Sequence, residues 1–213
     1  MKINFLGDSI TQGACATKDE NTYTALVCKH FGAERCCFGI GGTRIARQVE
    51  NKDEYDKGYF MTRAVKMPKD ADFTFVFGGT NDYGHGDAPL GNINSTSDYT
   101  FYGAVKNLAN YIVDNFPKDK VCFILPIPRY NQDSPYGEGF KKEPAHSLST
   151  YINAEKEVLD SLGIEYLDLS NSFYLPQTKE PFDIYQDGLH PNDKGHALLA
   201  SLLIDYLKKR NFP

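Results

Sequence analysis

The sequence predicts an α/β fold in which a parallel sheet is covered by helices. Short apolar runs alternate with segments of helical periodicity over the whole length of 213 residues, and this alternation is typical of βαβ units. The chain contains no internal repeat, low-complexity tract or linker. We therefore expect one domain over residues 1–213, which at 41% hydrophobic content is long enough to bury a large core.

Five short apolar runs are the predicted strands, and most of them end at Gly, Pro or Asp. They cover residues 3–6, 36–40, 73–77, 121–125 and 164–167. Apolar residues at helical spacing predict helices over residues 102–116, 148–159 and 198–206. Together these segments form the predicted sheet and its helical cover.

Charge and hydropathy argue against two classes of partner. A formal net charge of −5 leaves no basic stripe for a phosphate backbone, so we expect no nucleic-acid partner. No stretch approaches the ~20 apolar residues of a membrane span, and the first residues contain no apolar run of signal-peptide length. We therefore expect a cytoplasmic protein without membrane contact, and the sequence leaves its oligomeric state open.

The cysteines are expected to be reduced and to take no part in the chemistry. There are five of them, so they cannot all pair, and none forms a CxxC motif. Cys36, Cys37 and Cys122 lie in predicted strands, where a small buried apolar residue is the simplest interpretation.

Polar residues follow the predicted strands at the ends where ligands of open parallel sheets bind. Ser9 follows the first strand, Gly41 and Gly42 follow the second, and Asn81 follows the third. The segment DGLHPN, residues 187–192, comes after the fifth strand through a long connection. We expect all of these to meet at one edge of the sheet.

Ser9, Asp187 and His190 are the three side chains that a serine hydrolase needs. With a spacing of three residues, Asp187 can accept the Nδ1 proton of His190 while Nε2 faces Ser9. The alternatives are an ordinary turn serine, and an aspartate that caps a helix beside a surface histidine.

Gly42 and Asn81 are candidates for an oxyanion hole together with the N–H of Ser9. A glycine without a side chain leaves its N–H free to meet a substrate, and an asparagine amide is a donor. A tight glycine turn and an Asn-Asp turn are the alternatives. Nucleotide binding is not indicated, because Arg44 stands where a third glycine is required and no Gly-Lys-Ser/Thr loop occurs.

Taken together, GDSI, GIGGT, GTND and DGLHPN resemble the sequence blocks of the SGNH hydrolases, also called the GDSL family of esterases and lipases. The resemblance spans residues 2–207 and implies a three-layer α/β/α, flavodoxin-like sandwich with a five-stranded parallel sheet. It also implies that no metal or other cofactor is used. The GxSxG elbow of the α/β-hydrolases is absent, which separates the chain from that esterase class.

The resemblance implies a role for each matched residue. Ser9 is the nucleophile, His190 the base and Asp187 its acidic partner. The oxyanion hole consists of the N–H of Ser9, the N–H of Gly42 and the amide of Asn81.

Two polar loops, after the third and fourth strands, are predicted to wall the substrate pocket. They are rich in Gly and short polar residues, which argues against a long acyl tunnel. The predicted substrate-binding residues are Asp8, Tyr83, His85, Arg129 and Tyr130. We therefore expect a short-chain ester, acetyl above all, such as an acylated sugar, and the loops also resemble those of the carbohydrate-esterase branch of the family.

Two other functions stay open at this point. A thioesterase or lysophospholipase would use the same triad and differ only in acyl preference. A non-catalytic carbohydrate-binding protein would lack at least one of the site residues, yet all are present. His85, Asp87 and His146 match no dense metal-ligand spacing, so we predict no metal site.

Overall fold

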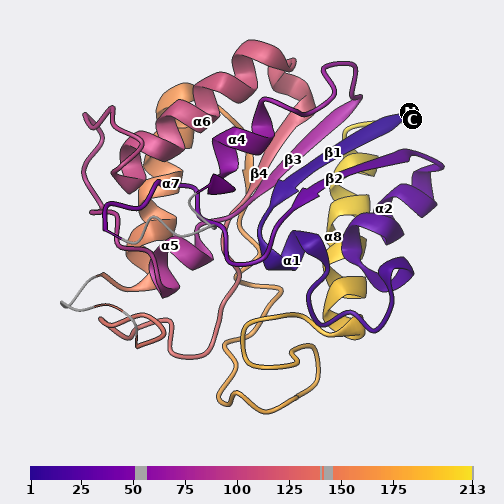
Figure 1. Cartoon of the computed structure of the whole chain (residues 1–213). Helices are drawn as coiled ribbons and strands as arrows, with labels where there is room; N and C mark the ends of the chain where they lie inside the picture. Colours follow the sequence, from indigo (N-terminus) through magenta and orange to yellow (C-terminus); the bar gives the residue numbers. More distant parts are fainter. Residues whose placement is uncertain (51–56, 140, 142–145, 213) are drawn as a thin grey trace.

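A five-stranded parallel sheet forms the centre of the protein (Figure 1). The computed structural model describes residues 1–50, 57–139, 141 and 146–212. The strand order is β2-β1-β3-β4-β5, and every neighbouring pair is parallel. The strands are β1 (Lys2–Gly7), β2 (Glu34–Gly39), β3 (Phe73–Phe77), β4 (Val121–Ile124) and β5 (Tyr166–Leu167). All the predicted strands are confirmed, although the last one is shorter than expected.

Helices cover both faces of the sheet (Figure 1). On one face lie α2 (Tyr23–Phe31) and α8 (Asp193–Lys209). On the other lie α4 (Phe60–Ala64), α6 (Phe101–Asn115) and α7 (Leu148–Leu162). The short helices α1 (Ser9–Gln12) and α5 (Thr80–Gly84) follow β1 and β3, and 3-10 turns span Asp19–Asn21 and Lys118–Lys120. The fold is therefore the expected three-layer sandwich.

The side chains of β3 show how the sheet divides the core in two. Phe73, Phe75 and Phe77 pack with residues of α2 and α8, whereas Val76 packs with residues of α4, α6 and α7. Every residue of β3 is buried because helices cover both faces of a parallel sheet. None of the helices in the described ranges is both long and apolar enough to cross a membrane.

The edge strand β2 corrects one expectation about the cysteines. Cys122, on the interior strand β4, is fully buried as predicted. Cys36 is only half-buried and Cys37 is exposed, because β2 has a neighbour on one side only. All five cysteines are unpaired.

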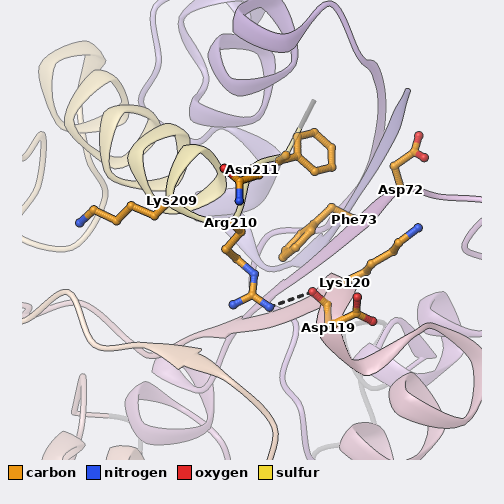
Figure 2. Close-up of a pocket in the computed structure, with 8 residues that line it drawn as sticks. Asp72, Phe73, Asp119, Lys120, Lys209, Arg210 and Asn211 are labelled. Carbon is orange, nitrogen blue, oxygen red and sulfur yellow. Dashed lines mark hydrogen bonds between the residues drawn. The ribbon is translucent and has the colours of Figure 1, made fainter.

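A hollow of about 510 Å³ lies at the amino ends of the strands (Figure 2). Phe73, the first residue of β3, lines it together with Lys120, which precedes β4, and Arg210, which follows α8. Arg210 donates a hydrogen bond to the carbonyl of Asp119 at 2.9 Å. Ligands of open parallel sheets bind at the opposite, carboxyl ends, so we assign no function to this hollow.

Candidate active site

Ser9 begins a short helix directly after the buried strand β1. Asp8 caps this helix, because its Oδ1 accepts the N–H of Ile10 at 3.0 Å. Gly13 ends the helix in the left-handed conformation, with φ of 99°. Ser9 is therefore held at the carboxyl end of β1, with its backbone N–H at a helix N-terminus.

Ser9, His190 and Asp187 form one hydrogen-bonded chain. The Nε2 atom of His190 lies 2.9 Å from Ser9 Oγ, and its Nδ1 atom lies 2.7 Å from Asp187 Oδ2. Because a carboxylate accepts, Nδ1 carries the proton and Nε2 is free to accept from the serine. The side chains of His190 and Asp187 are 20% and 44% exposed, so a small molecule can reach them from solvent.

Hydrogen bonds keep Asp187 ionised. Its Oδ1 accepts the backbone N–H groups of Leu189 at 3.0 Å and of His190 at 2.7 Å. Partial burial raises the pKa of Asp187, but these bonds and the His190 ring outweigh it and lower the pKa to about 2. Asp187 is therefore an anion in neutral and mildly acidic solution.

The segment with His190 is tied to the loop that follows α1. At the start of α8, Asp193 accepts the N–H of Thr17 at 2.8 Å and its hydroxyl at 2.6 Å. One turn later, the fully buried His196 donates from Nε2 to the carbonyl of Ala14 at 3.1 Å. These contacts join two distant parts of the chain, and so hold His190 beside the serine.

The turn over residues 40–43, here called the glycine turn, passes beside Ser9. The N–H of Gly41 donates to Oε1 of Gln12 at 2.7 Å, and a Cβ placed on Gly41 would lie 3.6 Å from Ser9 Cβ. Gly42 is the third residue of the turn over residues 40–43 and has φ of 74°, as a type II turn requires at that position. Among the described residues, none accepts the N–H of Ser9 or Gly42.

Asn81 contacts the same turn from α5. Its Nδ2 donates to the carbonyl of Thr43 at 3.0 Å, and its Oδ1 lies 3.2 Å from His85 Nε2. An amide nitrogen has two hydrogens, and within the described ranges only Thr43 accepts one of them. The second hydrogen is therefore available to a ligand beside the glycine turn.

Arg63, which the sequence did not indicate, forms hydrogen bonds with the ends of β1 and β2 and with the glycine turn. It is 4% exposed and its Nη1 donates to the carbonyl of Gly7 at 2.5 Å and to that of Phe38. Its Nη2 donates to Thr43 Oγ1 at 2.7 Å. Burial lowers the pKa of Arg63 to about 10, although Asp8 opposes this. No motif marks this arginine, since its partners come from distant segments.

Asp82 holds the segment after the glycine turn. Its two carboxylate oxygens accept the N–H groups of Ile45 at 3.0 Å and Ala46 at 2.9 Å. Burial raises the pKa of Asp82 to about 6, against the effect of these two hydrogen bonds. Burial raises the pKa of Asp8 to about 6 in the same way.

Tyr83 and Arg129 are buried, which corrects the expectation that they contact substrate. Tyr83 has no exposed surface, and its hydroxyl donates to the carbonyl of Asn131. Arg129 is 4% exposed, pairs with Glu138 and donates to the carbonyl of Thr80 at 3.2 Å. Both side chains fasten the loop after β4 to α5.

The other three predicted substrate-binding residues lie near the site in different environments. Asp8 is 1% exposed and its carboxylate is used as a helix cap, so it does not face a substrate. Tyr130 is half-buried, and its N–H donates to the carbonyl of Gly188 at 2.7 Å. Gly188 lies between Asp187 and His190 in the sequence. His85 is half-buried behind Asn81.

Cys15 is a further neighbour of Asp187 and His190 that the sequence did not indicate. Its Sγ and the ligand atoms of Asp187 and His190 lie within 4.8 Å of one another, the only such group in the described part of the chain. Burial and the charge of Asp187 raise the pKa of the Cys15 thiol. A metal here would compete with the bond between Asp187 and His190.

Comparison with known proteins agrees with this fold. Residues 5–198 match the model of the GDSL-like lipase/acylhydrolase family, and no curated protein sequence matches the chain significantly. A structure from Lactobacillus plantarum is 29% identical, with a TM-score of 0.81 over 98% of this chain and 96% of that one. A carbohydrate acetylesterase from Sinorhizobium meliloti is 19% identical, with a TM-score of 0.62 over 98% and 99%. The chain therefore belongs to the GDSL-like lipase/acylhydrolase family and is an ester-hydrolysing enzyme.

Proposed function

We propose that the protein is a serine esterase that hydrolyses short-chain acyl esters, acetyl esters above all, through an acyl-enzyme. The observation that supports this most strongly is the hydrogen-bonded chain from Ser9 to His190 at 2.9 Å and from His190 to Asp187 at 2.7 Å. These three residues come from opposite ends of the sequence, and serine nucleophiles are activated by this arrangement.

In the first half of the reaction, Ser9 Oγ attacks the acyl carbon while His190 Nε2 takes its proton. Asp187 keeps the imidazole in the required tautomer and stabilises the imidazolium. When the tetrahedral intermediate breaks down, His190 gives the proton to the leaving alcohol and the acyl group stays on Ser9. In the second half, water attacks the acyl-enzyme with the same proton transfers and releases the acid.

Three donors bind the oxyanion in this proposal: the N–H of Ser9, the N–H of Gly42 and Nδ2 of Asn81. The position of the glycine turn supports this assignment, since a Cβ placed on Gly41 would lie 3.6 Å from Ser9 Cβ and the carbonyl of Thr43 accepts from Asn81 at 3.0 Å. One such donor typically contributes ~10²–10³-fold to kcat.

A short acyl group is favoured by the small and polar residues beside the serine. A Cβ on Gly41 would lie 3.6 Å from Ser9 Cβ, and the side chain of Gln12 accepts the N–H of Gly41 at 2.7 Å. The similar structure of a carbohydrate acetylesterase agrees with an acetylated sugar as substrate. Tyr130, half-buried next to the Asp187–His190 segment, is our candidate for contact with the alcohol part.

The test is hydrolysis of p-nitrophenyl acetate by the wild type, Ser9→Ala and Ser201→Ala. Ser201 is exposed on α8 and serves as the matched control. We expect Ser9→Ala to lose at least ~10³-fold in kcat with an unchanged melting temperature, and Ser201→Ala to keep wild-type kinetics. Equal rates for Ser9→Ala and the wild type would refute the assignment of the nucleophile.

A chain-length series then tests the acyl preference. We expect kcat/KM to fall from acetate to octanoate esters, and acetate to be released from acetylated sugars. A preference for octanoate, or for acyl thioesters over the matching oxygen esters, would instead indicate a lipase or a thioesterase.

A further inference from the structure

Arg44 and His85, two residues outside the proposed triad, are hydrogen-bonded in series to Asn81, and we call this series the relay. The geometry points to His85 as a positioning residue that, held by Arg44, orients the Asn81 amide for the oxyanion. This inference rests on the proposed function, because it takes Asn81 as an oxyanion donor. It replaces the sequence-based expectation that His85 binds substrate.

The relay fixes the tautomer of His85. Arg44 is 4% exposed, and its Nη2 lies 2.9 Å from His85 Nδ1. A guanidinium only donates, so Nδ1 must accept, and in the neutral ring Nε2 then carries the proton. That proton is donated to Asn81 Oδ1 at 3.2 Å. His85 is thereby a donor to Asn81.

The same bonds fix the orientation of the Asn81 amide. Asn81 Oδ1 accepts from His85, and Asn81 Nδ2 donates to the carbonyl of Thr43 at 3.0 Å, so each atom has a complementary partner. A rotation of the amide by half a turn would bring two donors together at His85 and two acceptors together at Thr43. The relay therefore keeps an N–H, and not the carbonyl oxygen, beside the glycine turn.

A bond accepted at Oδ1 also strengthens the donor at the other end of the amide. Hydrogen bonds in a chain polarise one another, and each makes the next a better donor. The spacing explains how the pair meets, because Asn81 and His85 are four residues apart and the N–H of His85 donates to the carbonyl of Asn81 at 3.0 Å. Orientation and polarisation both act on the transition state, so kcat is the parameter that His85 should change.

The first experiment compares His85→Gln with His85→Asn in p-nitrophenyl acetate hydrolysis. The Gln amide nitrogen can reach the place of Nε2 and donate to Asn81, whereas the Asn side chain reaches only the place of Nδ1. We expect His85→Asn to lower kcat roughly ten-fold with KM unchanged, and His85→Gln to restore most of the loss. A raised KM with unchanged kcat in both variants would mean direct substrate contact and would overturn the relay.

The second experiment is a double-mutant cycle with Asn81→Ala. We expect Asn81→Ala to lose ~10²-fold in kcat, and His85→Asn to have no further effect in that background. Additive losses would show that His85 acts independently of Asn81, and would overturn the relay while leaving the proposed function intact. An unchanged kcat in Asn81→Ala would overturn the oxyanion assignment itself. Melting temperatures of all variants show that the kinetic effects are not caused by unfolding.

Discussion

At the scale of single residues, the surroundings shift the pKa values of two aspartates, Asp187 and Asp82, in opposite directions. Hydrogen bonds from a histidine ring and two backbone N–H groups lower the pKa of Asp187 to about 2 in spite of partial burial. Full burial raises the pKa of Asp82 to about 6, although two backbone N–H groups bind its carboxylate. Asp187, beside His190, is thus a permanent anion, whereas Asp82 takes up a proton in mildly acidic solution.

Asp82 should make the protein less stable as the pH rises from about 4 to about 6. Its pKa is above its ordinary value of 3.8, so in this range the folded state holds the proton that the unfolded state has lost. We expect Asp82→Asn to remove this slope, a difference on the order of 2 kcal/mol between pH 4 and 7. Urea denaturation across this range measures it.

The matched control for that measurement is Asp114→Asn, an exposed position on α6. It should keep the pH dependence of the wild type. Parallel stability curves for Asp82→Asn and the wild type would show that the folded and unfolded states titrate Asp82 alike, contrary to the expectation.

At the scale of elements, the position of α1 depends on how closely β2 approaches it. A Cβ on Gly39, the last residue of β2, would lie 2.2 Å from the N atom of Gln12 and 2.6 Å from the carbonyl carbon of Thr11. Both are backbone atoms of α1, which cannot move aside independently. The absence of a side chain at Gly39 therefore allows α1, and with it Ser9, to pack directly on the sheet.

Gly39→Ala should displace α1 and so lower activity. Overpacking of this kind costs about 1–3 kcal/mol of stability, and a shift of the proposed nucleophile Ser9 by about 1 Å can cost ~10²-fold in kcat. The control is Gly32→Ala after α2, where φ is 61° and nothing lies within 4 Å of the added Cβ. We expect Gly32→Ala to lose stability by about 1 kcal/mol and to keep its kcat. Equal kcat values in the two variants would contradict the argument.

At the scale of the whole molecule, the site assembles where the sheet order reverses direction. β1 and β3 are neighbours although β2 lies between them in sequence, and ligands bind at such a switch point. Ser9 follows β1 and Asn81 lies just after β3. Arg63 ties this region together, because it reaches the ends of β1 and β2 and the glycine turn at once.

Arg63→Met should be among the most destabilising substitutions in the protein. It removes the guanidinium donor from the carbonyls of Gly7 and Phe38 and from the Thr43 hydroxyl, and of these Gly7 still accepts the N–H of Ile40 at 3.2 Å. We expect a cost of at least about 3 kcal/mol. The control is Arg35→Met, which removes a surface ion pair with Asp19 and should cost no more than about 1 kcal/mol. Chemical denaturation compares the two, and similar midpoints would contradict the role given to Arg63.

The fold class, the strands and the family could all be predicted from local patterns in the sequence. Predicted strands at residues 3–6, 36–40, 73–77 and 121–125 match β1 to β4 closely, and three predicted helices match α6, α7 and α8. Hydrophobic periodicity and the glycines and prolines that end segments are local signals, so they can be interpreted without the fold. The family blocks are also short and contiguous, and the family match over residues 5–198 confirms the resemblance.

The sequence could not show which polar side chains face the candidate site and which support it from within the fold. Tyr83 and Arg129 are as polar in sequence as Tyr130, yet they are buried and Tyr130 is half-buried. Cys15 lies beside Asp187 and His190, and Arg63 donates to Gly7, so the neighbours of both residues are distant in the sequence. Burial and hydrogen-bond partners depend on long-range packing, which no local pattern in the chain encodes.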